Sequence, residues 1–186
     1  DLGSDFNLGL MGGYSWQHFE VESTGSTYDY VDNQVFTAPY LDAREYYLLS
    51  VFGRLNLTMF DDFLLTVSVR HDGTSRFSED NRWGTFPGVA LAWKMLNGDG
   101  AGSTSLKLRL GYGLTGQQGI SPTDYYPYLP RYSYGTPTAT YQFGDEFVTV
   151  LRPSGYDANI KWEETTTYNL GLDYSILDDR LNGAID

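Results

Sequence analysis

Cysteine is absent from this chain of 186 residues, which excludes disulfides, thiol catalysis and zinc sites built on cysteine. No run of about 18 apolar residues occurs, so the sequence contains no transmembrane helix. Charged residues make up only 19% of the chain, and acidic side chains outnumber basic ones by 24 to 12. The formal net charge of −12 argues against nucleic acid as a partner, because a phosphate backbone would be repelled.

An apolar repeat of helical period is missing as well, and apolar and polar residues instead alternate along much of the chain. Alternation with period two is typical of strands, and the abundant glycine and aromatic residues indicate a β-rich fold. The parity of the apolar residues predicts six long strands and the start of a seventh at Gly183. The predicted strands are residues 5–16, 46–58, 63–70, 83–93, 106–115 and 167–176.

The strand at 83–93 has the dimensions of a membrane span. Trp83 and Trp93 fall on one face, ten residue steps apart, while small residues occupy the other face. At about 3.3 Å per residue and a tilt near 40°, this spacing projects to roughly 25 Å, the height of the lipid-facing band of an outer-membrane barrel. Thr85 and Pro87 lie inside that band and weaken the interpretation.

The predicted connections alternate in length. Short connections at 59–62, 96–103 and 177–181 alternate with long ones at 23–42, 71–82 and 117–160. Long loops on one side and tight turns on the other are typical of outer-membrane barrels. We therefore predict an all-β fold, an antiparallel up-and-down meander of about six or seven strands that forms part of a larger transmembrane β-barrel. A soluble β-sandwich with its apolar faces turned inward is the alternative.

No group of residues has the spacing of a catalytic or metal site. His18 and His71 lie on different predicted hairpins, and the Asp pairs at 61–62 and 178–179 lie in tight turns, where Asp bonds local backbone. A GxGxxG match at 111–116 lies within a strand and lacks the helix that a phosphate site needs. We expect no enzyme activity, no cofactor and no bound metal.

A binding role fits the long connection at 117–160, where aromatic rings alternate with prolines and a cation. Such a mixture suits stacking on sugar faces or packing on a protein. The alternative is that the tyrosines pack the loop onto itself and the rim of the barrel. The candidate substrate or partner contacts are Tyr125, Tyr126, Tyr128, Arg131 and Tyr132.

Three segments resemble one protein family. Residues 70–77 read RHDGTSRF and residues 81–87 read NRWGTFP, which is similar to the signature hairpin of SusC/RagA-type TonB-dependent outer-membrane transporters, with Thr74 in place of a serine. Residues 108–120 and 161–173 resemble two further family segments, in the same order. The hairpin residues that match the signature are Arg70, Asp72, Gly73, Arg76, Phe77, Asn81, Arg82, Trp83 and Gly84.

The resemblance implies a longer protein than these residues contain. Family members carry an N-terminal domain, a TonB box, a plug and a barrel of roughly 22 strands. We therefore expect residues 1–186 to be a partial barrel domain, with the plug, the TonB box and the terminal strands outside it. The implied function is import of glycan or peptide nutrients across a Gram-negative outer membrane; the alternative is a soluble β-sheet carbohydrate-binding or adhesion module.

The resemblance also implies the partners. They are the remainder of the barrel and the plug, a SusD-like lipoprotein on the extracellular side, the TonB complex through the missing N-terminal part, and outer-membrane lipid.

Overall fold

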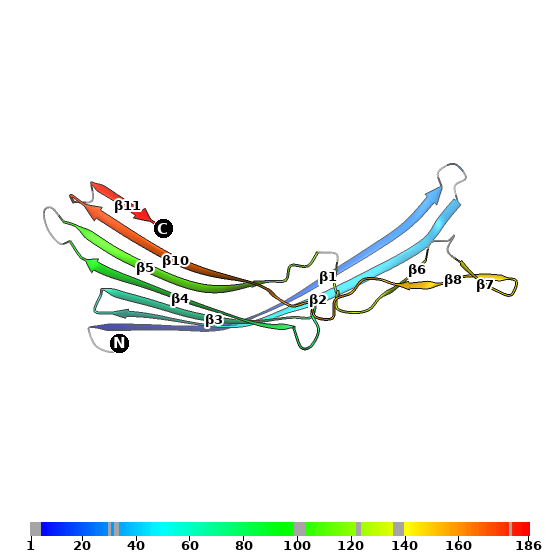
Figure 1. The fold of residues 1–186 in the computed structure, drawn as a ribbon, viewed down its shortest axis with the longest axis horizontal. Helices are drawn as coiled ribbons and strands as arrows, with labels where there is room; N and C mark the ends of the chain where they lie inside the picture. The colour runs from blue at the N-terminus through cyan, green and yellow to red at the C-terminus, as the bar shows by residue number, and fades with distance from the viewer. Residues whose placement is uncertain are drawn as a thin grey trace.

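A computed structural model describes residues 5–29, 31, 34–98, 103–121, 124–135, 140–178 and 180–186, and at 27–28 and 34–40 it describes the backbone alone. Figure 1 shows a single curved sheet from which one long hairpin projects. Seven strands form this sheet, in the order β1-β2-β3-β4-β5-β10-β11. Their bounds are β1 Phe6–Asp29, β2 Gln34–Met59, β3 Phe63–Thr74, β4 Trp83–Leu96, β5 Ser105–Gln117, β10 Glu163–Ile176 and β11 Leu181–Ile185.

Every neighbouring pair in the main sheet is antiparallel, and each strand lies beside the next long strand along the chain. The predicted up-and-down meander is therefore confirmed, including its seventh strand. None of the residues that the structure describes forms a helix long and apolar enough to cross a membrane.

The prediction of a long loop at 23–42 is wrong. β1 and β2 continue as a paired hairpin arm, in which Ser23 pairs with Asp42 and Thr24 with Leu41, up to a β-bulge beside Gly25. Figure 1 shows this arm extending well past the ends of β3 and β4. The apolar alternation that marked the lower strands fades here, but backbone hydrogen bonding does not depend on it.

The long connection at 117–160 is also more ordered than predicted. It contains two small two-stranded sheets that lie beneath the arm (Figure 1). Their strands are β6 Tyr132–Tyr134 paired with β9 Leu151–Pro153, and β7 Thr140–Phe143 paired with β8 Glu146–Thr149. The remaining described residues of this connection form turns and extended backbone.

Tight turns close the hairpins at the other end of the sheet. In the β2–β3 turn, Phe60 and Asp61 have φ of 53° and 58°, and the backbone N–H of Asp62 donates to the carbonyl of Met59. Leu177 and Asp178 also have positive φ, in the β10–β11 turn. Consecutive residues of positive φ give a turn whose twist matches that of the flanking strands. The predicted short connections at 59–62 and 177–181 are therefore confirmed, and residues 99–102 of the third, at 96–103, lie outside the described residues.

The described residues bury very few apolar side chains. Phe77, Phe86 and Tyr125 are the buried ones, and all three lie where the loops meet the sheet. Elsewhere the sheet is a single layer with many exposed leucine, valine and aromatic side chains. Such a continuous apolar surface needs a covering environment.

Candidate functional site

Two rows of aromatic side chains border the face of the sheet that carries Trp83 and Trp93, which we define as the outer face. In the lower row, Phe63 stacks on its cross-strand partner Trp93, with 5.5 Å between ring centroids. In the upper row, Trp83 stacks on His71 at 4.9 Å with parallel rings. The indoles of Trp83 and Trp93 are 45% and 37% exposed. Their predicted placement on one uncovered face is confirmed.

The same two rows continue onto β1. Phe6 pairs with Met59, which pairs with Phe63, so Phe6 belongs to the lower row. Trp16 pairs with Leu49 in the upper row and lies 6.0 Å from the ring of Tyr47. Ten residue steps separate Phe6 from Trp16, as they separate Trp93 from Trp83. The apolar outer face therefore has one height on both strands, roughly that of a bilayer core crossed by tilted strands.

The chemistry of the two faces reverses above the upper row. On β1 past Trp16, the outer face carries His18, Glu20 and Glu22, and the inner face carries Phe19 and Val21. On β2, Tyr46 lies on the inner face and stacks on Phe19 at 4.6 Å. An outer face that is apolar below Trp16 and acidic above it marks the upper limit of an apolar environment.

The two residues that weakened the membrane interpretation are both accommodated. Pro87 lies at the point where β4 separates from β5, because pairing between these strands begins only at Gly88 with Gly113. Proline is tolerated where a strand has an open edge. The hydroxyl of Thr85 lies 2.8 Å from Nδ1 of His71, so its polar group has a partner on the outer face.

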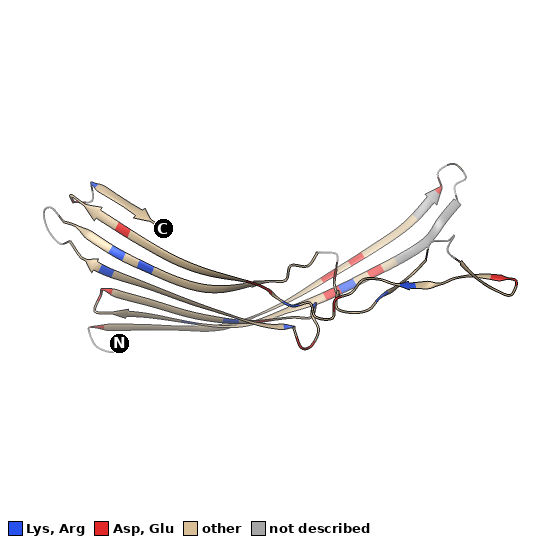
Figure 2. Ribbon diagram, in the orientation of Figure 1, with Lys and Arg blue, Asp and Glu red and all other residues tan. Residues whose placement is uncertain are grey.

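Ion pairs cross the lower inner face. Asp173 pairs with Lys107 at 2.9 Å and with Arg109 at 2.8 Å, and Arg109 also contacts Asp186 at 2.7 Å. Figure 2 shows the charges of β5 and β10 near the turn end of the sheet. The inner face is therefore polar where the outer face is apolar.

A second inner-face ion pair lies higher, on β3. The Nε of Arg70 lies 2.7 Å from Asp72, and Nη2 of Arg70 donates to the hydroxyl of Ser50. Arg54, on the same face, donates to Asn56. Both arginines therefore have a hydrogen-bonding partner on the inner face.

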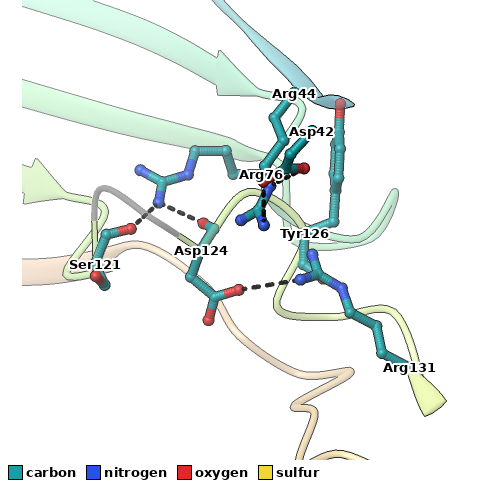
Figure 3. Close-up of polar contacts among 7 residues, drawn as sticks. All are labelled: Asp42, Arg44, Arg76, Ser121, Asp124, Tyr126 and Arg131. Carbon is teal, nitrogen blue, oxygen red and sulfur yellow. Dashed lines mark hydrogen bonds and ion pairs between the residues drawn. The ribbon is translucent and has the colours of Figure 1, made fainter. Parts of the chain in front are cut away.

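Arg76 holds three separate segments together at the top of the sheet. Its guanidinium donates to the carbonyls of Ser121 and Asp124, both at 2.6 Å (Figure 3). The same group donates to Oε1 of Gln118 at 3.1 Å. It also lies 5.1 Å from the ring centroid of Tyr46 on the arm. The residue is only 6% exposed. This Arg76 junction joins the β3–β4 loop, the start of the long connection and the arm.

An aromatic cluster lies next to the Arg76 junction. Phe77 is fully buried and meets Trp162 edge to face at 5.6 Å, while Phe86 meets the same indole at 5.4 Å. The ring of Phe86 covers Gly84 and Gly116 so closely that a Cβ on either residue would lie 2.5 Å or less from its Cζ. Glycine is therefore required at both positions.

Some of the loop tyrosines anchor the loop to the arm, and others are exposed to solvent. Tyr125 is 6% exposed and packs against Tyr46 at 5.8 Å, and Tyr126 donates its hydroxyl to the carbonyl of Glu45. Tyr132 is 65% exposed, in β6. Arg131 donates to the carbonyl of Tyr126 at 3.4 Å and lies 4.0 Å from Asp124 (Figure 3). Tyr128 is half-buried and meets Tyr126 edge to face at 6.4 Å.

Charged groups of the arm support the contact that Tyr125 and Tyr126 make with it. Arg44 lies 5.5 Å from the ring centroid of Tyr125 and donates to Asp42 at 2.8 Å, and this hydrogen bond raises the pKa of the guanidinium. Burial, and next the carboxylate of Glu45, raise the pKa of Tyr126 above its ordinary 10.0. The Tyr126 hydroxyl is therefore held neutral as a donor.

The hairpin motif residues do not converge on one ligand site. Gly73 admits the ring of Trp83, Asn81 caps its own loop through Ser78, and Arg82 offers its carbonyl to Trp162. The sequence did not reveal that Trp162 and Phe86 form the centre of the aromatic cluster beside the Arg76 junction. A tryptophan directly before the strand at 163–176 was the available signal.

The described residues contain no group of three or more His, Asp or Glu side chains placed to hold a metal ion. The side chains described above pack together, form ion pairs or are exposed to solvent.

A single-layer antiparallel meander with an apolar outer face, a polar inner face and long loops at one end defines the wall of an outer-membrane-type β-barrel. The family model described as TonB dependent receptor-like, beta-barrel matches residues 1–186, and the chain belongs to this family. The members of this family are outer-membrane transport receptors and not enzymes. The alternative of a soluble β-sheet binding or adhesion module is therefore not favoured.

Two relatives show the family in sequence. The TonB-dependent receptor SusC of Bacteroides thetaiotaomicron is 48% identical over 143 residues, which cover 75% of this chain and 14% of that protein. The TonB-dependent receptor P3 of Formosa agariphila is 33% identical over 198 residues, covering 97% and 19%. The chain thus spans less than a fifth of the length of these relatives.

Solved structures show the same fold. The structure of the RagAB peptide transporter matches with a TM-score of 0.74 at 21% identity, over 97% of this chain and 21% of that one. The RagAB peptide importer in its open-open state matches with a TM-score of 0.75, over 97% and 20%. The predicted SusC/RagA-type resemblance is confirmed.

Proposed function

We propose that this chain is a section of a transporter in a Gram-negative outer membrane, which imports glycan or peptide nutrients with energy supplied through TonB. The observation that carries the proposal is the outer face, with two aromatic rows ten residues apart and a reversal to acidic residues above the upper row. The name of the RagAB peptide importer supports peptides, and the SusC relative supports the same transporter type.

In this function, residues 1–186 supply part of the barrel wall. The inner-face groups Arg54, Arg70, Lys107 and Arg109 face the interior, where the plug of the longer protein would lie. The plug, the TonB box and the terminal strands belong to segments outside these residues. The small share of each relative that the chain covers supports this division.

The presented loop residues are the proposed contacts to substrate or partner. Tyr128, Arg131 and Tyr132 lie beyond the Arg76 junction, and Tyr132 is largely exposed. Tyr125 and Tyr126 act with them by holding the loop against the arm. Replacing Tyr132 and Arg131 with alanine should reduce ligand or partner binding and leave the barrel intact.

A SusD-like lipoprotein is the proposed extracellular partner. The two small sheets, β6–β9 and β7–β8, expose large apolar side chains to which a protein surface could bind. These side chains are Tyr134, Tyr141, Phe143, Phe147 and Leu151. Replacing Tyr141 and Phe143, which share one face of β7, with serine should abolish copurification of the lipoprotein, while the same change at Glu146 and Asp145 should not.

One comparison in whole cells tests the proposed function. The full-length gene is deleted, and uptake of labelled oligosaccharides and labelled peptides is measured with and without its return. Loss of uptake of one class, restored only when TonB is present, is the expected result. A full-length protein recovered without detergent as a soluble monomer would overturn the proposal.

A further inference from the structure

Arg82 carries a positive charge that none of the described residues neutralises. Its Nε is shielded from solvent and has no hydrogen-bonding partner among the residues that the structure describes. Nε of Arg76 lacks a partner as well, but the terminal nitrogens of Arg76 have three acceptors. A shielded donor on a charged group costs free energy when it is unpaired. No polar contact with the described residues therefore holds the Arg82 side chain in this position.

The other arginines show that this state is unusual in the sheet and its loops. Arg70, Arg109 and Arg131 each lie within 4.0 Å of a carboxylate oxygen. Arg180, in the β10–β11 turn, also has no partner in the described part of the chain, but it is exposed and water can solvate it. Arg82 is only partly exposed. It is the arginine for which an acceptor outside the described residues would gain most.

Two carboxylates lie close to Arg82 in the sequence, and neither pairs with it. Glu79 and Asp80 are both exposed, in the loop that leads to β4. This loop is closed by the backbone N–H of Asn81, which donates to the carbonyl of Ser78 at 3.0 Å. A loop that carries two acidic side chains could neutralise a neighbouring arginine, yet this one leaves the guanidinium of Arg82 available.

The backbone of Arg82 is fixed on the inner face of the sheet. Its carbonyl accepts hydrogen bonds from the N–H of Thr74 at 3.1 Å and from the indole of Trp162 at 3.0 Å. The first bond continues the β3–β4 pairing one step beyond the pair of Gly73 and Trp83. Trp83 lies on the outer face and successive residues alternate, so Arg82 belongs to the inner face. It lies at the end of the sheet that carries the long loops.

We propose that the guanidinium of Arg82 binds a carboxylate group of the imported substrate, either the C-terminus of an oligopeptide or a uronic acid of an acidic glycan. The inference rests on the proposed transporter and deepens it, because import of glycans or peptides leaves the charge of the substrate open. A guanidinium can bind a carboxylate through two parallel N–H···O bonds. Turning Arg82 toward such a ligand breaks no hydrogen bond with a described residue and gives its Nε an acceptor.

The test measures binding to the full-length protein purified in detergent. Two pairs of labelled probes are used, and only one member of each pair has a carboxylate. The first pair is an oligopeptide with a free C-terminus and the same peptide with a C-terminal amide. The second pair is an oligogalacturonate and its methyl ester. In one of the two pairs, the wild-type protein should bind the acid about tenfold more tightly than the capped form.

Substitutions then assign this preference to Arg82. Arg82→Gln removes the charge, so it should weaken binding of the acid about tenfold and leave binding of the capped form unchanged. Arg82→Lys keeps the charge but not the planar fork, and it should retain part of the preference. Arg180→Gln removes the exposed unpaired arginine of the β10–β11 turn, and it should bind both probes as the wild-type protein does.

Equal affinity for the acid and the capped form in both pairs would overturn the carboxylate site, as would a preference that survives Arg82→Gln. Heat-modifiable migration on a gel is followed in every variant. A lower transition temperature of Arg82→Gln with an unchanged preference would show that a carboxylate of the longer protein is the partner instead. If Arg82→Gln does not fold, Arg82→Lys decides, because a full wild-type preference in that variant contradicts the proposal.

The same probes separate this inference from the proposed function. Uptake of both acids is measured in cells with and without the full-length gene. Uptake that does not depend on the gene would contradict the proposed transporter, whereas uptake that depends on the gene but ignores the carboxylate would contradict only the role of Arg82.

Discussion

The indole N–H of Trp162 donates to the backbone carbonyl of Arg82 at 3.0 Å, across 80 residues of chain. The same indole packs against Phe77 and Phe86, so one side chain ties the start of β10 to the β3–β4 loop. Replacing Trp162 with alanine should destabilise this packing by about 3–5 kcal/mol, and replacing it with phenylalanine by about 1 kcal/mol.

Limited proteolysis of the 117–160 connection in the detergent-solubilised full-length protein measures the effect of these two substitutions. Trp93→Phe, on the outer face, is the matched control and should leave cleavage unchanged. Cleavage of the Trp162→Ala protein at the wild-type rate would contradict the assigned role.

The glycines beneath Phe86 give a second prediction. A Cβ at Gly116 would lie 2.0 Å from Cζ of Phe86, whereas a Cβ at Gly113 would meet nothing within 4 Å. Gly116→Ala should therefore destabilise the barrel by about 1–3 kcal/mol, and Gly113→Ala should have little effect. The temperature at which heat-modifiable migration is lost is the measurement.

Combining the substitutions at Gly116 and Phe86 tests whether the Phe86 ring causes the destabilisation. If the ring of Phe86 is the cause, Phe86→Leu should be less harmful in the Gly116→Ala protein than alone. Additive effects of the two changes would show that the clash lies elsewhere.

Arg76 should not tolerate replacement by lysine. Its planar guanidinium serves the carbonyls of Ser121 and Asp124 and the amide of Gln118 at once, and a single ammonium group cannot reproduce that geometry. Arg76→Lys should leave buried carbonyls unpaired and cost about 1–3 kcal/mol, seen as faster proteolysis at 117–125. Arg152→Lys, at an exposed site in β9, is the control, and an equal effect of both would refute the prediction.

The contact of Tyr126 with the arm should be lost at alkaline pH. Because its pKa is raised above 10.0 in the folded protein, its contribution to stability is complete below pH 10 and is lost as the pH rises through the folded pKa. A fluorescent reporter at Tyr128→Cys should show release of the loop from the arm at pH above 10. Tyr126→Phe should abolish that step, and a step that persists would assign it to another group.

The sequence predicted those elements that have one apolar and one polar face. The strand at 83–93 shows this, because two faces of different polarity produce an alternation that is readable residue by residue. The arm at 17–29 and 34–45 was missed because it lies above the upper aromatic row, where neither face has to be apolar.

The loop contacts depend on distance in space and could not be read locally. Tyr125 was predicted as a contact residue by its type, and the structure buries it against Tyr46, which lies 79 positions earlier. Trp162 and Arg82 are similarly remote in sequence. Such pairs are set by the closure of the β5–β10 connection and have no periodic signature.

The reversal of polarity at Trp16 sets a rule for how the arm can change length. Successive residues of a strand point to opposite sides, so an insertion of two residues in each strand of the arm, above the Trp16–Leu49 pair, would lengthen the arm by roughly 7 Å and preserve which side chains face the loops. An insertion of one residue in each strand would exchange the acidic and aromatic sides and expose Phe19 and Tyr46 where Glu20 and Glu45 now stand. Natural variation in the reach of this hairpin should therefore occur in even steps.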